Sequence, residues 1–552
     1  MSQKLIECVP NFSEGVNLDI IKQITNEVES VEGVRLLNVD PGKATNRTVV
    51  TFVGEPEKVI QAAFLAIKKA GELIDMSKQK GEHPRMGATD VCPLIPISNI
   101  SMEETAEYAR QLAKRVGEEL QIPVYLYEQA QPNKNRSNLS VIRAGEYEGF
   151  FKKIKLPEWA PDFGPAENDV RRGATVIGAR DFLVAYNVNL NTTSTRRANA
   201  IAFDVREAGR TINDENGKPQ NIPGSLKAVK AIGWYIEEYG IAQISMNLTN
   251  IEITPVHKAF DEVCDKANTR GIRVTGSELV GLIPLKAMLD AGKYFLRKQK
   301  RSVGVSEKEL IRIAIKSMGL DELGPFIPEE RIIEYLLKDK AASKLVSMSL
   351  VEFADETASE SPAPGGGSIS AYVGSLGASL AGMVANLSSH KKGWDDRWEE
   401  FSNWAEKAQA YKDELIRLVD LDTTAFNRIM ESFGLPKSTP EEKAARDKAI
   451  QDATKYAIEI PFKVMQAALN SMEVIKAMVE IGNPNSVTDG GVAALCARTA
   501  VLGAFMNVKI NASGYKDKDF VTDIIAKGND IEQKAIALEA EVIELVNGKI
   551  GL

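Results

Sequence analysis

The pattern of apolar and polar positions changes its period along the chain. In the first third, short runs rich in β-branched residues alternate with longer amphipathic stretches. This pattern predicts strands at 5–9, 34–40, 46–53 and 124–127, and helices at 19–31, 55–74 and 101–120. The order of strand, helix, strand, strand, helix, strand is typical of an α+β two-layer sandwich with helices on one face of a sheet.

The same α+β pattern resumes after a Pro- and Gly-rich stretch at 157–178, and it ends near residue 327. Beyond it lie a charged helical segment, a linker-like stretch at 358–367, and long helical patterns that continue to the C-terminus. We therefore expect a multidomain protein in which two ferredoxin-like sandwiches precede an all-α bundle. The expected boundaries are 1–180, 181–327, a linker helix at 328–347, and a bundle at 348–552.

Composition narrows the classes of function. The 552 residues are 44% hydrophobic and 26% charged, and the formal net charge is -8, which argues against nucleic acid or an anionic membrane as the main partner. The N-terminus lacks a signal-peptide core, and the most apolar stretch, 369–387, is diluted by Ser and Gly. The four cysteines form no CxxC pair, so neither a disulfide framework nor zinc is indicated. We expect a cytoplasmic protein that holds no metal.

One of only three histidines lies in a loop built from residues that resist helix. His83 is preceded by Gly81 and followed by Pro84 and Gly87, and the loop leads into an apolar strand. A histidine on such a loop is suited to proton transfer near neutral pH, although a structural hydrogen bond is an equally ordinary role. Asp40, at the end of a predicted strand, is suited to orienting an imidazole, and its alternative role is to start a turn.

Three arginines stand among glycines between residues 161 and 180. Arg171, Arg172 and Arg180 have the chemistry to pair with the carboxylates of a flat ligand, or they belong to a solvated crossover between domains. The glycines there do not follow the GxGxxG spacing, so a dinucleotide is not indicated.

The helical part contains two further candidates. Asp422 lies within an apolar stripe that includes Leu418 and Phe426, so burial would raise its pKa and suit it to proton transfer. Its alternative role is a buried, hydrogen-bonded structural acid. Gly365, Gly366 and Gly367 precede a helix and would let backbone N–H groups converge on an anion, unless they form a hinge capped by Ser368.

Several ordered motifs carry a resemblance to known families. The motifs that resemble formiminotransferases are ECVPNFSEG (7–15), NRTV (46–49), GEHPRMG (81–87), DVCP (90–93), PDFGP (161–165), GATV (173–176), GAR (178–180), IGWY (232–235) and LVGL (279–282). Those that resemble cyclodeaminases are APGGGS (363–368), LVDLD (418–422) and LPK (435–437). In this order they resemble the bifunctional formimidoyltransferase-cyclodeaminase family over nearly the whole chain.

The resemblance implies two folate reactions that complete histidine degradation. The first half would transfer the formimino group of N-formimino-L-glutamate to tetrahydrofolate, and the second would form 5,10-methenyltetrahydrofolate and ammonia. The cosubstrate would be polyglutamylated tetrahydrofolate, and the protein would be a homo-oligomer with contacts through both domains. Two alternatives keep the scaffold, namely a formylglutamate donor or a methenyltetrahydrofolate cyclohydrolase, and a third is a folate-binding protein without activity.

The resemblance also assigns residues. It places the transferase histidine on His83 and the cyclodeaminase acid on Asp422. From the residues themselves, and not from the resemblance, we expect Asp40 to assist His83 and the glycines 365–367 to contact folate in the bundle. The family's folate-binding loop falls on Phe163, Gly164, Pro165, Ala166, Glu167, Asn168, Asp169, Val170, Arg171 and Arg172.

Overall fold

The computed structural model describes residues 4–43, 45–81, 84–167, 169–215, 217–337 and 345–551. The chain forms two compact units. The first contains Met1–Met288 and Ile315–Leu337, and the second contains Leu289–Ala314 and Lys338–Leu552. The segment expected to form one subdomain at 181–327 is thus divided between the two units. Sheet-containing domains precede an all-helical region, as the sequence predicts.

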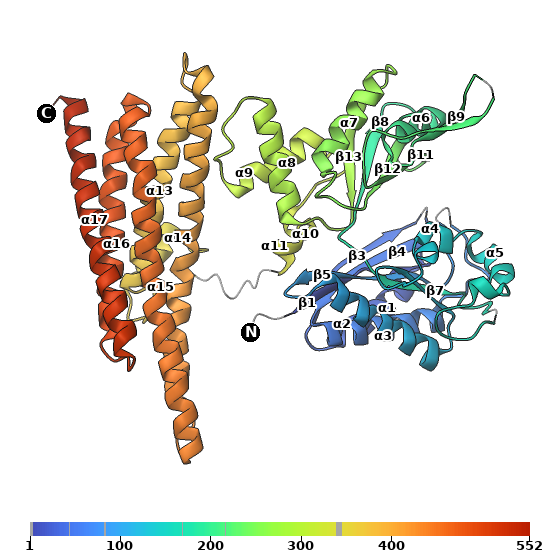
Figure 1. Cartoon of the computed structure of the whole chain (residues 1–552), viewed down its shortest axis with the longest axis horizontal. Coiled ribbons are helices and arrows are strands. Elements are labelled where there is room, and N and C mark those ends of the chain that lie inside the picture. The colour runs from blue at the N-terminus through green and yellow to red at the C-terminus, as the bar shows by residue number, and fades with distance from the viewer. Residues whose placement is uncertain are drawn as a thin grey trace. The chain divides into compact units, whose positions relative to one another are not determined.

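A seven-stranded sheet forms the first part of the first unit (Figure 1). β4 pairs with β3 and with β1 and β2, and these two short strands pair in turn with β5. β7 and β6 then extend the sheet in parallel with β5. The strands are β1 (Leu5–Cys8), β2 (Asn11–Phe12), β3 (Val34–Gly42), β4 (Arg47–Gly54), β5 (Thr89–Ser98), β6 (Val124–Glu128) and β7 (Thr175–Ala179).

Three helices cover one face of this sheet, namely α1 (Leu18–Glu29), α2 (Pro56–Leu73) and α3 (Met102–Leu120). Alternate residues of the strands pack against them in one core, which contains Ile6, Cys8, Val50, Phe52, Cys92 and Leu94. The residues between these positions face the other way, and they include Glu7 and Thr51. The alternation therefore leaves the second face available for a site.

Short segments lie between β6 and β7 of this sheet in the chain. They are η1 (Lys134–Arg136), α4 (Leu139–Ile142), α5 (Glu146–Lys153) and η2 (Pro157–Trp159). Tyr125, Phe150 and Ile154 form part of a small core beneath them.

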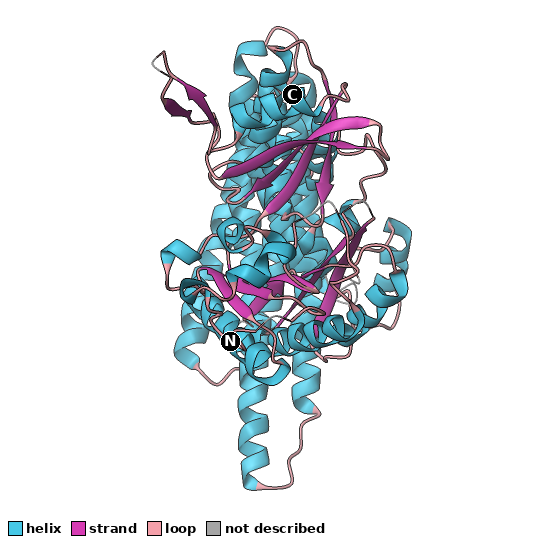
Figure 2. Ribbon diagram, turned by 90° about the vertical axis from the view of Figure 1, so that its right-hand side faces the viewer, coloured by secondary structure: helices cyan, strands magenta, loops and turns pink. Residues whose placement is uncertain are grey.

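The second sheet has four antiparallel strands in the order β11-β12-β8-β13 (Figure 2). Its strands are β8 (Val184–Leu190), β11 (Val229–Ile236), β12 (Ile241–Leu248) and β13 (Val274–Val280). Helix α6 (Thr195–Val205) follows β8 in the chain, and helix α7 (Val256–Asn268) connects β12 to β13. A separate hairpin, β9 (Arg210–Asn213) and β10 (Pro219–Ile222), lies between α6 and β11 in the chain.

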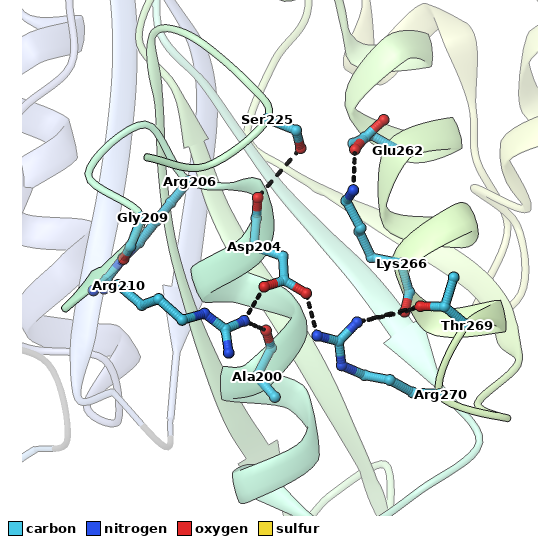
Figure 3. A network of polar contacts seen from close by, with 10 residues as sticks. All are labelled: Ala200, Asp204, Arg206, Gly209, Arg210, Ser225, Glu262, Lys266, Thr269 and Arg270. Carbon is cyan, nitrogen blue, oxygen red and sulfur yellow. Dashed lines mark hydrogen bonds and ion pairs between the residues drawn. The ribbon is translucent and has the colours of Figure 1, made fainter. Parts of the chain in front are cut away.

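A polar network fastens the hairpin and α7 to α6 (Figure 3). The carboxylate of Asp204, near the end of α6, accepts hydrogen bonds from Arg210 at the start of β9 and Arg270 after α7. Arg210 also donates to the carbonyl of Ala200 at 2.7 Å. Because both oxygens of Asp204 bind guanidinium groups, one partly buried acid holds three elements together.

Four helices follow the second sheet: α8 (Leu285–Lys298), α9 (Glu307–Met318), α10 (Pro328–Arg331) and α11 (Ile333–Leu337). The segment from the middle of α8 to the middle of α9 packs within the second unit. Val303 N–H donates to Ser402 Oγ at 3.0 Å, and Asn386 Nδ2 donates to the carbonyl of Gly304 at 2.8 Å. A Cβ atom at Gly304 would overlap Ala405, so this contact requires glycine.

Long helices packed side by side form the second unit (Figure 1). They are α12 (Leu350–Thr357), α13 (Gly366–Ser389), α14 (Trp398–Phe433), α15 (Pro440–Ile481), α16 (Val487–Ala512) and α17 (Lys518–Ile550), with short turns η3 (Asp395–Arg397) and η4 (Pro484–Ser486). Their common core contains many alanines, among them Ala371, Ala381, Ala497 and Ala504. Such small side chains allow the helices to approach closely.

Two segments of the bundle, Gly366–Ser389 and Pro484–Ala512, are long and apolar enough to cross a membrane by length and composition. This differs from the expectation that no stretch is apolar enough. Within the bundle, 61% and 50% of their most apolar windows are buried, and core helices of helical bundles share this composition.

Candidate active sites

A cavity of about 540 Å³ lies in the first unit, with walls from both sheets. Glu7, Val49, Thr51, Pro93 and Ile95 come from the first sheet, on the face opposite to α1, α2 and α3. The second sheet contributes Ala185, Lys230, Asn247 and Val280. The period-two alternation of β1, β4 and β5 thus gives one face to the core and the other to the cavity.

Four cationic side chains line this cavity: Arg47, Arg143, Arg180 and Lys230. Arg143 donates to the buried carboxylate of Asp90 at 2.6 Å. Burial lowers the pKa of Arg47 to about 10. The acids Glu7, Glu128 and Asp181 also line the wall, so positive groups outnumber negative ones there. The cavity is therefore suited to a ligand that carries carboxylates.

Glu7 is the most buried of these acids, with 1% of its surface exposed. Its Oε2 atom has no hydrogen-bond partner among the residues that the structure describes. Burial raises the pKa of Glu7 to about 7, and the charge of Arg180 opposes this shift. A buried carboxyl with an unused oxygen at a cavity wall is unusual, because such groups ordinarily find a partner.

The described residues on either side of the predicted histidine bond to residues next to the cavity lining. His83 itself lies outside the described residues, as does Asn168. On the N-terminal side of His83, Gln79 Oε1 and the carbonyl of Lys80 accept hydrogen bonds from Asn46 Nδ2, at 2.7 Å and 2.8 Å. After it, Met86 N–H donates to Asp90 Oδ1 at 2.9 Å. Asn46 precedes the cavity residue Arg47, and Asp90 pairs with the cavity residue Arg143.

Asp40 lies on β3, opposite Val49 of β4. It accepts a hydrogen bond from the N–H of Gly281, a residue of the cavity wall. Burial raises the pKa of Asp40, and Arg331 opposes the shift. Asp40 is therefore held near the edge of the cavity, and its predicted contact with His83 stays a prediction.

The described residues of the predicted folate-binding loop, 163–167 and 169–172, do not line the cavity. They run beside the segment after His83, where Ala88 N–H donates to the carbonyl of Arg172 at 2.8 Å. The guanidinium groups donate to backbone carbonyls, Arg171 to Glu72 at 2.6 Å and Arg172 to Leu120 at 2.7 Å. These two arginines thus bind the C-terminal ends of α2 and α3.

The second unit brings Asp422 to the start of α13. Its carboxylate accepts hydrogen bonds from the Ser368 hydroxyl, at 3.0 Å, and from the Ser368 backbone N–H. Ser368 is fully buried, and its hydroxyl also lies 3.1 Å from the carbonyl of Val419. Burial raises the pKa of Asp422, whereas the bonds from Ser368 lower it. The helix N-terminus favours the charged form of this acid.

The glycines before Ser368 make this approach possible. A Cβ atom at Gly367 would overlap the carboxylate of Asp422, and one at Gly366 would lie 3.3 Å from Nδ2 of Asn507. Asn507, on α16, is held by a 3.0 Å bond from Nδ2 to the carbonyl of Gly503. The predicted residues Asp422 and 365–367 are thus brought together, and Asn507 joins them. The alternative of a hinge does not describe 366–367, which are the first turn of α13.

Sequence reasoning singled out neither Glu7 nor Arg47. A signal exists for Glu7, because an acid between Ile6 and Cys8 in a short buried strand breaks the apolar run. Asn507 lies 141 positions after its neighbour Gly366, so no local pattern connects the two. The residues that the structure describes contain no group of three or more His, Cys, Asp or Glu that could hold a metal ion.

Fold and site together define a class: an α+β unit with a cationic cavity, joined to a helical unit with an acid at a helix N-terminus. Models of known protein families match both the α+β part and the helical part of the chain. A model of the formiminotransferase domain, N-terminal subdomain, matches residues 5–180, and a model of the formiminotransferase domain matches 185–338. A model described as formiminotransferase-cyclodeaminase matches residues 349–530.

Similar relatives agree with these models. A formimidoyltransferase-cyclodeaminase of Gallus gallus is 46% identical over 521 residues, which are 94% of each chain. A glutamate formimidoyltransferase of Thermoplasma acidophilum is 43% identical over 53% of this chain and 92% of its own. A methenyltetrahydrofolate cyclohydrolase of Methylorubrum extorquens is 34% identical over 36% of this chain and 95% of its own. The chain belongs to the formimidoyltransferase-cyclodeaminase family.

Proposed function

We infer that this chain catalyses two consecutive reactions of one-carbon metabolism. The first unit transfers the formimino group of N-formimino-L-glutamate to N5 of tetrahydrofolate and releases glutamate. The second unit converts 5-formiminotetrahydrofolate to 5,10-methenyltetrahydrofolate and releases ammonia, which completes histidine degradation. The observation that carries this conclusion is the 46% identity to a bifunctional relative over 94% of both chains, with both parts in the same order.

For the transfer, we propose that His83 moves the proton. Attack by N5 on the formimino carbon forms a C–N bond, and the N5 proton must leave. The bond from that carbon to the glutamate nitrogen then breaks, and this nitrogen must gain a proton. One imidazole can do both in turn. Asp40, held by Gly281, would orient the imidazole, and the cavity cations Arg47, Arg180 and Lys230 would bind substrate carboxylates.

For the ring closure, we propose that Asp422 moves the proton. N10 attacks the formimino carbon and loses its proton, and the bond from this carbon to the departing nitrogen breaks as ammonia leaves. An acid whose pKa is raised by burial is suited to accept the first proton and return it to the nitrogen. The start of α13, at 365–367, would contact an anionic part of folate, and Asn507 stands beside it.

The substrate requires several finer proposals. We propose that tetrahydrofolate carries a polyglutamate tail, which the cationic cavity supports. Loop 163–172 would contact folate through the Phe163 ring and backbone groups, since its arginines bind helix ends. Neither reaction needs a metal. We also propose that both sandwiches are ferredoxin-like, which the strand orders β3-β4-β1-β5 and β11-β12-β8-β13 support.

We propose that the protein is a cytoplasmic homo-oligomer that binds neither nucleic acid nor membrane. The net charge of -8 supports the last part. Exposed apolar residues on two bundle helices support self-association: Leu376, Met383 and Leu387 on α13, and Val492, Leu495, Met506 and Ile510 on α16. Light scattering coupled to gel filtration would test this, and a single monomer peak at micromolar concentration would contradict it.

A second candidate applies to the helical unit alone. The helical unit is similar to a methenyltetrahydrofolate cyclohydrolase. The second candidate function of this unit is therefore the hydrolysis of methenyltetrahydrofolate instead of its formation. Formylglutamate is the corresponding alternative donor for the first unit. Both alternatives predict that no ammonia is released.

One coupled assay tests these assignments. The protein is mixed with tetrahydrofolate and formiminoglutamate, while methenyltetrahydrofolate absorbance and ammonia are followed together. We expect both signals to rise at equal rates in the steady state. Glutamate release without methenyltetrahydrofolate would contradict the proposed second reaction. Turnover only with formylglutamate would contradict the proposed donor.

A further inference from the structure

Glu7 is a buried acid that the reactions proposed above do not use. It stands on β1, paired with Val53 of β4 and Ile95 of β5, in the middle of the sheet face that lines the cavity. Only 1% of its surface is exposed, and Oε2 has no partner among the described residues. An acid kept in this position without a full set of partners leaves room for a ligand to complete it.

The surroundings of Glu7 restrict the kind of ligand. Burial raises the pKa of Glu7, and Arg180 is the nearby cation whose charge opposes this rise; Tyr127 bonds to Arg180 at the cavity wall. Arg180 also donates to the carbonyl of Asp181 at 2.9 Å. The cavity thus presents a carboxylate oxygen that has no partner among the described residues, together with several cations in the lining. A ligand that pairs with this carboxylate oxygen and also with the cations carries a small positive group on an otherwise anionic molecule.

The formimino donor has this distribution of charge. Its formimino group is an amidine, a strong base that is protonated at neutral pH, and its glutamate part carries two carboxylates. The planar N–C–N unit of an amidinium presents parallel N–H donors to a carboxylate, as a guanidinium does. A formyl group is neutral and presents an oxygen in the same place, which a carboxylate repels.

We propose that Glu7 is the residue that recognises the amidinium of the donor and selects formimino over formyl. This inference rests on the proposed transfer reaction and deepens it by naming a specificity-determining side chain. Oε2 accepts an N–H of the formimino group, while Arg180 and the other cavity cations bind the carboxylates of the glutamate. Glu7 takes no proton from the reacting atoms, so proton transfer is left to His83.

The test compares two donors in Glu7→Gln. This change keeps the shape of the side chain and removes its charge. We expect kcat/KM for formiminoglutamate to fall by about 100-fold, mainly through KM, because a buried charged pair is lost. The value for formylglutamate should not fall, because an amide can donate to the formyl oxygen. Glu7→Asp keeps the charge but holds it on a shorter side chain, farther from the ligand. It should retain part of the preference for formiminoglutamate that Glu7→Gln loses.

A matched control is Asp181→Asn, which removes an acid from the same cavity wall. It should change the two donors by similar factors and leave their ratio unaltered. Equal losses with both donors in Glu7→Gln would overturn the inference, since that result indicates a structural acid. If wild-type protein uses no formiminoglutamate at all, the proposed function fails first, and the two failures are thereby distinguished.

Wild-type protein supplies a second measurement that does not depend on a folded variant. Formamidinium chloride should inhibit the transfer competitively against formiminoglutamate, and formamide at the same concentration should inhibit at least tenfold less. Glu7→Gln, if folded, should lose this difference. Equal inhibition by the two compounds in the wild-type protein would overturn the inference even if Glu7→Gln does not fold.

Discussion

Each unit holds a carboxylic acid whose pKa is raised by burial, Glu7 being fully buried and Asp422 partly buried, and the two acids have different partners. Glu7 lies on a strand at the wall of a cavity, and the charge of Arg180 acts on it, with further cations elsewhere in the lining. Asp422 lies on a helix, and its partners are the hydroxyl and backbone N–H of Ser368 at the start of α13. Side-chain cations suit recognition of a charged substrate, whereas a helix N-terminus holds one acid in place. Burial raises both pKa values, so the different roles follow from the different surroundings of the two acids.

The largest expected effect tests whether the two sites are independent. Asp422→Asn should lower cyclodeaminase turnover about 1000-fold and leave transfer unchanged, because a proton-transfer group is lost. His83→Ala should do the reverse by a similar factor. Each activity is measured separately, with 5-formiminotetrahydrofolate supplied directly for the second. Loss of both activities in either folded variant would contradict two independent sites.

A smaller effect is expected from the glycine that lets Asp422 approach α13. In Gly367→Ala the new Cβ overlaps the carboxylate, so Asp422 must move away from Ser368. We expect cyclodeaminase turnover to fall about 100-fold, because misplacement by about 1 Å has that effect. Gly548→Ala is the control, since a Cβ atom there meets nothing within 4 Å in α17. If Gly367→Ala keeps full turnover, the contact between Asp422 and α13 is not needed.

The pH dependence of stability should distinguish Glu7 from an ordinary surface acid. Burial raises its pKa in the folded state from the ordinary value of 4.5 to about 7, so the folded state binds more protons between these values. The free energy of unfolding should therefore fall as pH rises from about 4.5 to about 7, by no more than roughly 3 kcal/mol. Glu7→Gln should flatten this dependence. Urea unfolding at several pH values measures this dependence. If the free energy of unfolding changes with pH equally in the wild-type protein and in Glu7→Gln, the raised pKa of Glu7 is contradicted.

The smallest effect concerns the arginine at the end of the predicted folate-binding loop. Arg172→Met removes the bonds to Leu120 and Gln121 at the end of α3. We expect the free energy of unfolding to fall by about 1–2 kcal/mol, with KM for tetrahydrofolate changing less than about threefold. A tenfold rise in KM without loss of stability would show instead that the guanidinium binds folate.

Much of the architecture could be predicted from local pattern. The period-two runs at 5–9 and 46–53 correspond to β1 and β4, and the helical period at 101–120 corresponds to α3 (Met102–Leu120). The β9–β10 hairpin was missed, because its residues, such as Thr211 and Gln220, are exposed and show no apolar alternation. The packing of 289–314 with the bundle was missed as well, because it depends on contacts such as Gly304 with Ala405.

The sequence by itself determined the order of the units, the family, and the residues His83 and Asp422 as candidates, because motifs and periodicity are local properties. The packing of strands and helices sets which face of β1 carries Glu7, which cation lies near it, and which glycine lies against Asp422. Asp422 and Gly367 are 55 positions apart, and Glu7 and Arg180 are 173 positions apart. No local pattern encodes such pairs, because they form only when the strands and helices pack.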